Sequence, residues 1–184
     1  MAADSIHVDL TLAGAGVFVS DDDAQFEQRH RLPDGGFGGI EELRLERSFS
    51  GDGTLRLTGH ALFEQHDYAA DFLLDAPDKG FLRAGYREFR TWTDGSAGFF
   101  PQAGATFFQP EDDELTLDRG EAWVAAGLRL PGRPKLDLAY RHQTRDGSKN
   151  SLVWGDTNAT GGFGTRSIVP AFLDVDETSD IVEA

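Results

Sequence analysis

The sequence contains no cysteine among its 184 residues. Disulfide bonds, thiolate metal sites and thioether attachment of haem to this chain are therefore excluded. The sequence also has no apolar run near the roughly 18 residues that a transmembrane helix requires, which excludes a helical membrane protein. A membrane β-barrel is compatible with this absence, because its strands alternate apolar and polar residues and produce no hydropathy peak.

Positive charge is scarce. The chain has 17 basic residues against 32 acidic residues, which gives a formal net charge of −15. Because phosphate binding needs a basic surface, nucleic acid is excluded as a partner. The first five residues offer neither a basic region nor an apolar core, so no signal peptide is predicted in this sequence. We therefore expect either a cytoplasmic protein or a mature or truncated sequence.

The usual catalytic motifs are missing as well. There is no Gly-x-Ser-x-Gly elbow, and the glycine-rich run at 35–39 is too short for a phosphate loop. We therefore predict that the chain is not an enzyme and that it binds no cofactor. The histidines show no metal-ligand spacing, and the acidic clusters match no EF-hand loop, so no metal site is predicted. The histidines are His7, His30, His60, His66 and His142.

Residues 121–144 show the clearest pattern in the chain. Apolar and polar residues alternate on both sides of a turn with the sequence Pro-Gly-Arg-Pro. This alternation is typical of a β-hairpin with one apolar face, in a tilted transmembrane strand or in a soluble sheet. The apolar positions, which a barrel would turn toward lipid, are Ala122, Val124, Ala126, Leu128, Leu136 and Leu138.

The same alternation recurs along the chain and predicts strands at 6–19, 40–49, 54–63, 68–74, 81–92, 115–130, 135–144 and 177–184. The predicted fold class is all-β, an antiparallel up-and-down meander of about eight strands in a single segment spanning 1–184. Little helix is expected. Residues 20–37 are interpreted as a loop, and longer loops are expected at about 93–114 and 145–176.

The lengths of these connections favour a membrane protein. Tight turns are predicted after the second, fourth and sixth strands, which places them at one end of the sheet, and the two longest loops at the other end. Bacterial outer-membrane barrels combine short periplasmic turns with long external loops, whereas sandwiches distribute long connections to both ends. The meander is therefore interpreted as part of a large transmembrane β-barrel.

In such a barrel the polar positions would line the lumen, and aromatic residues near strand ends would mark the membrane interfaces. In a soluble sheet the same polar positions would form a solvated face. The predicted lumen-facing residues are Arg56, Arg83, Arg87, Arg129, Lys135, Asp137 and Arg141. The predicted interface aromatics are Tyr86, Trp92, Trp123 and Tyr140.

Three runs carry a resemblance to a known family. They are GFLRAGYREFRTWTDGSAGFF at 80–100, the run at 117–156, and RSIVPAFLDVDETSDIV at 166–182. These runs resemble the decahaem-associated outer-membrane barrel proteins of the MtrB/PioB type. The resemblance implies a barrel that sheathes a periplasmic multihaem cytochrome, so that electrons cross the outer membrane. Some family members carry a Cys-x-x-Cys that this chain lacks, and eight strands are too few to enclose a cytochrome, which implies a fragment.

The sequence thus predicts an outer-membrane scaffold or channel in contact with the lipid bilayer, with cytochrome sheathing as its sharpest form. A general porin or substrate channel is the first alternative. A soluble extracellular β-sandwich that binds a ligand is the second.

Overall fold

The computed structural model describes residues 5–21, 23–49, 52–93, 115–158 and 165–184, and it describes the side chains of these residues except at 152–171. The described residues form one helix and eight strands. These are β1 (Ser5–Val17), α1 (Asp23–His30), β2 (Gly35–Ser48), β3 (Thr54–Phe63), β4 (Asp67–Ala76), β5 (Gly80–Thr93), β6 (Leu115–Leu128), β7 (Leu136–Asn158) and β8 (Thr165–Glu183). The prediction of an all-β meander with little helix is confirmed.

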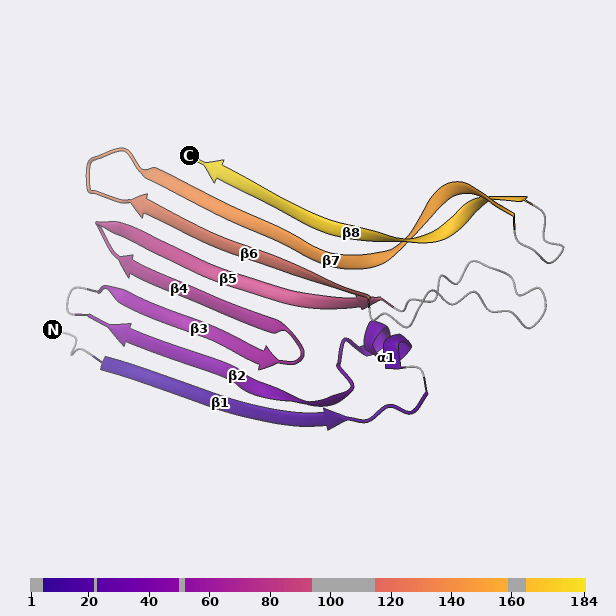
Figure 1. Ribbon diagram of the computed structural model, residues 1–184. Coiled ribbons are helices and arrows are strands. Elements are labelled where there is room, and N and C mark those ends of the chain that lie inside the picture. The colour runs from indigo at the N-terminus through magenta and orange to yellow at the C-terminus, as the bar shows by residue number, and fades with distance from the viewer. Residues whose placement is uncertain (1–4, 22, 50–51, 94–114, 159–164) are drawn as a thin grey trace.

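All eight strands belong to a single antiparallel sheet in which each strand pairs with its neighbours in sequence order, from β1 to β8 (Figure 1). The sheet is open, because β1 and β8 are not paired with each other in the described part of the chain. The connections β2–β3, β4–β5 and β6–β7 lie at one end, which we call the turn end. Helix α1 and the β3–β4 connection lie at the other end, which we call the loop end.

The turns follow the local sequence. In the β6–β7 connection the Arg133 amide donates to the Leu130 carbonyl at 3.1 Å, and Gly132 has a φ of 67°. A proline followed by a residue with positive φ is the signature of a type II turn. The β4–β5 connection repeats this arrangement, with Asp78 at a φ of 62° and the Lys79 amide bonded to the Ala76 carbonyl at 3.0 Å.

The segment 20–37 is not the loop that the sequence predicts, because it contains α1 and the first residues of β2. The acidic residue Asp23 begins the helix and accepts a hydrogen bond from the Ala24 amide at 2.8 Å. Negative charge is favourable at this end of a helix. The helix ends where Arg31 takes a positive φ of 56°. No apolar stripe marks this short helix, so hydrophobic periodicity does not reveal it.

The predicted loop at 145–176 is also wrong over most of its length. β7 continues to Asn158 and β8 begins at Thr165, so this hairpin extends well past the rest of the sheet (Figure 1). No regular alternation of apolar and polar residues marks these extensions, but cross-strand pairing continues through them. Most of the other predicted long loop, 94–114, lies outside the described residues.

A single-layer sheet buries few side chains. Among the described apolar residues only Trp92, Leu115, Leu117 and Val175 are buried. α1 contacts β5 at the loop end, where its Glu27 carboxylate is buried and accepts a hydrogen bond from the Asp34 amide at 3.0 Å. No helix in the described residues is long and apolar enough to cross a membrane. Within the described residues no second sheet covers either face, and the chemistry of the two faces differs.

Candidate functional site: two faces of the sheet

One face of the sheet carries apolar side chains on every strand, with Arg47 as a charged exception opposite Ile6 and Leu55. Residues that are directly opposite in an antiparallel sheet point to the same side, so the strand register assigns each side chain to a face. Leu82, for example, is opposite Leu74 and Ala126, and Ala126 is opposite Leu138. We call this surface the apolar face. Its members are Ile6, Val8, Leu10, Leu12, Ile40, Leu43, Leu45, Leu55, Leu57, Ala61, Tyr68, Ala70, Phe72, Leu74, Leu82, Ala84, Tyr86, Ala122, Val124, Ala126, Leu128, Leu136, Leu138, Tyr140 and Val182.

None of the described residues forms a layer over this face. Leu12 and Val182 are each 70% exposed, and Leu136 is 60% exposed. Transfer of one such side chain from water to an apolar environment contributes about 1.5–3 kcal/mol. An exposed apolar surface of this extent marks an interaction site. The six residues predicted to face lipid all lie on it.

Tyrosines form the border of the apolar face that lies toward the loop end. All three tyrosines of the chain lie there, together with a phenylalanine. We call these residues the tyrosine line: Phe63, Tyr68, Tyr86 and Tyr140. Beyond the line the same face becomes polar. The Tyr86 hydroxyl donates to Glu88, and the Tyr140 hydroxyl donates to Asp180 at 2.7 Å. Their rings thus lie in the apolar band and their hydroxyls bond polar groups outside it, as at a membrane interface.

The tyrosine line crosses the strands obliquely. Tyr68 is opposite Glu88, which is two residues beyond Tyr86 on β5. Tyr140 is opposite Val124, which is opposite Ala84, and Ala84 lies two residues before Tyr86 on β5. The line therefore moves four residues in the three steps from β4 to β7. A membrane plane that crosses strands tilted by 35–45° moves about 1–1.5 residues per strand, so the slope fits tilted spanning strands.

The opposite surface, which we call the charged face, carries ion pairs that join neighbouring strands. Glu46 accepts from Arg56 at 2.9 Å between β2 and β3, and Asp71 accepts from Arg83 at 3.0 Å between β4 and β5. Arg145 pairs with Glu177 at 2.7 Å between β7 and β8. Exposed pairs of this kind contribute about 0–1 kcal/mol each, so they neutralise the face more than they stabilise it.

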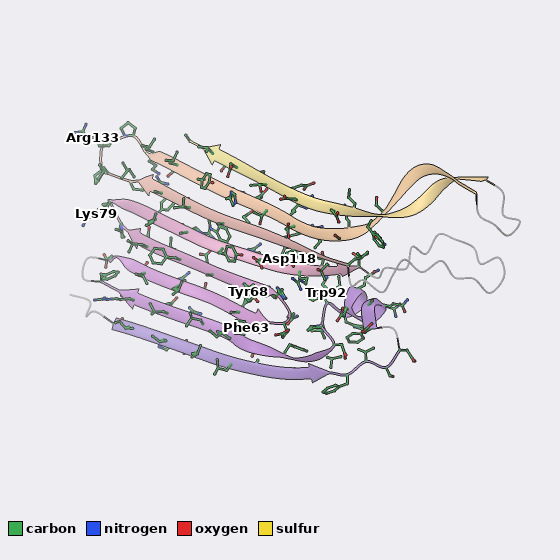
Figure 2. The ribbon with its side chains drawn as sticks, viewed as in Figure 1. Phe63, Tyr68, Lys79, Trp92, Asp118 and Arg133 are labelled. Atoms are coloured by element: carbon green, nitrogen blue, oxygen red, sulfur yellow. The ribbon has the colours of Figure 1, made fainter. Side chains whose placement is uncertain are left out.

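The residues predicted to line a lumen lie largely on this face. Arg56, Arg83, Arg87, Asp137 and Arg141 are placed there by the register. The other two predicted residues lie in the β6–β7 connection, Arg129 directly after β6 and Lys135 directly before β7. Of these, Arg129 reaches Asp137 at 2.6 Å, while Lys135 is exposed just before β7. Figure 2 shows Arg133 in the same connection and Lys79 in the β4–β5 turn, both at the turn end.

Two of the predicted interface aromatics do not lie on the tyrosine line. Trp123 lies on the charged face, opposite Gly85 and Arg141, with the Arg87 guanidinium carbon 6.0 Å from its ring centroid. Trp92 lies beyond the tyrosine line and is 6% exposed (Figure 2). Proximity to a strand end suggested both, whereas strand parity and packing determine which side an aromatic ring occupies. The other two, Tyr86 and Tyr140, lie on the tyrosine line.

The structure also brings together three residues that the sequence does not associate. His66, Glu88 and Asp118 come from different segments, yet their potential ligand atoms lie within 4.8 Å of one another. No local spacing identifies such a group. The alignment of β4, β5 and β6 is needed to find it.

Comparison with known proteins finds no matching family model, curated protein or solved structure.

Proposed function

We propose that this chain forms part of the wall of a large outer-membrane β-barrel, with the apolar face toward lipid and the charged face toward the lumen. The observation that carries the proposal is the exposed apolar surface, which is continuous over all eight strands. All the described strands belong to one sheet, so the described residues provide no second sheet to cover it. A bilayer supplies that cover.

The ends of the sheet support an orientation. The tyrosine line faces the loop end, and the short turns with Lys79 and Arg133 lie at the other end. In outer-membrane barrels the short turns face the periplasm. We therefore assign the turn end to the periplasm and the loop end to the outside.

The sharper form of the proposal concerns the contents of the lumen. Eight strands that remain an open sheet suit a wide barrel, because barrel diameter grows with strand number. The resemblance to decahaem-associated barrel proteins suggests that a multihaem cytochrome occupies that lumen. The chain would then insulate the haems from lipid and take no part in electron transfer itself. Co-purification of haem with the protein from outer membranes tests this form, and a haem-free complex would favour a porin.

Spin labels on neighbouring residues test which face meets lipid. Because the chain has no cysteine, Val124→Cys and Ala125→Cys each provide a single labelling site. These residues lie on opposite faces of β6. In membranes we expect the label at 124 to collide mainly with oxygen, which dissolves in lipid, and the label at 125 to collide mainly with a water-soluble nickel complex. Power-saturation electron paramagnetic resonance measures both collision rates.

The labels also separate the alternatives. Low collision rates with both reagents at position 124 would show that protein covers the apolar face, as in a sandwich. High accessibility to the nickel complex at this position would show a face in water. Either result would contradict the proposed lipid contact.

A further inference from the structure

A histidine and two carboxylates converge on the apolar-face side of the sheet, just beyond the tyrosine line. His66 lies in the connection between β3 and β4, Glu88 on β5 and Asp118 on β6. Each residue is half-buried, and the potential ligand atoms all lie within 4.8 Å of one another. The register explains the convergence, because Glu88 is opposite Tyr68, two residues after His66, and Asp118 is opposite Arg90.

Hydrogen bonds from neighbouring groups orient the two carboxylates and position the backbone of His66. Arg90 donates from Nε and Nη2 to the two carboxylate oxygens of Asp118, at 2.7 and 2.8 Å. Its backbone amide donates to the His66 carbonyl at 3.2 Å. The Tyr86 hydroxyl donates to Glu88. Metal-binding carboxylates are usually oriented by such outer hydrogen bonds, which leave lone pairs free for an ion.

We propose that His66, Glu88 and Asp118 bind a divalent transition-metal ion, with Zn²⁺ as the natural occupant. An imidazole with two carboxylates favours such an ion over Mg²⁺ or Ca²⁺, which prefer ligands that are all oxygen. Three protein ligands leave a fourth tetrahedral position for water. The two carboxylates and Arg90 together carry one net negative charge, which also favours a cation. The bound ion would tie the β3–β4 connection to β5 and β6. This site is independent of whether the apolar face meets lipid.

Metal titration of the purified full chain in detergent micelles tests the proposal. We expect one Co²⁺ per chain, with the visible absorption of a tetrahedral site, and displacement of Co²⁺ by Zn²⁺ but not by Mg²⁺ or Ca²⁺. Loss of an outer-shell partner typically weakens metal binding by about 10–100-fold. Removal of a ligand in His66→Ala or Glu88→Gln should weaken Zn²⁺ binding by more than that.

His142→Ala is the matched control, because this histidine lies on the same side of the sheet but bonds Asp180 at 2.8 Å. Its substitution should leave Zn²⁺ affinity unchanged. Far-UV circular dichroism checks that each variant keeps its strands, and Glu88→Gln preserves side-chain shape if His66→Ala does not fold. Absence of Co²⁺ absorption in the unmodified chain would overturn the proposal. So would equal Zn²⁺ affinity of the unmodified chain and Glu88→Gln.

Discussion

Ala126→Arg is expected to lower the free energy of unfolding in a bilayer by about 2–4 kcal/mol, the cost of arginine at the midplane of a membrane barrel. Ala126 is exposed on the apolar face, between Leu82 on β5 and Leu138 on β7. Its position leaves an arginine there without a polar neighbour directly across either strand pair. Urea unfolding of the protein in lipid vesicles, followed by tryptophan fluorescence, measures the change.

Ala139→Arg provides the matched control on the adjacent strand. Ala139 lies on the charged face, opposite Ala125 and Glu183, so an added guanidinium group meets a carboxylate there. We expect a change within about 0.5 kcal/mol, as for most surface substitutions. Equal losses for Ala126→Arg and Ala139→Arg would show that the two faces do not differ in environment. That result would contradict the proposed membrane orientation.

Strand parity was the part of the fold that the sequence predicted best. A period of two residues assigns side chains to faces without any tertiary information, so Val124 and Leu138 could be placed on the apolar face and Asp137 and Arg141 on the other. Turn chemistry was equally local. Proline followed by glycine at 131 and 132 supplies the dihedral angles that the β6–β7 turn requires.

The features that the sequence did not predict depend on pairing and packing. The extensions of β7 and β8 show no regular alternation in the sequence, and they are strands because they pair with each other. The convergence of His66, Glu88 and Asp118 depends on the alignment of three segments far apart in the sequence. The position of Trp123 depends on a glycine in the neighbouring strand, which local sequence around the tryptophan cannot reveal.

That glycine gives the second large effect: Gly85→Ala is expected to destabilise the protein by about 1–3 kcal/mol, as is usual for overpacking. A Cβ atom at Gly85 would overlap the Trp123 ring and would lie 2.8 Å from the Ala70 carbonyl oxygen. The bare backbone of Gly85 therefore provides the space that the indole occupies across β5 and β6. The Arg87 guanidinium group also lies near the Trp123 ring. Unfolding in urea measures the loss.

A double-mutant cycle and a control glycine identify the cause. Trp123→Ala removes the ring that an added Cβ would meet, so the double variant should lose less stability than the sum of the single variants, by about 0.5–3 kcal/mol. The contact with the Ala70 carbonyl remains, so the rescue should be incomplete. Gly14→Ala, where nothing lies within 4 Å of the added Cβ, should be neutral or slightly stabilising. Additive losses in the cycle would mean that contact with the Trp123 ring does not cause the effect of Gly85→Ala.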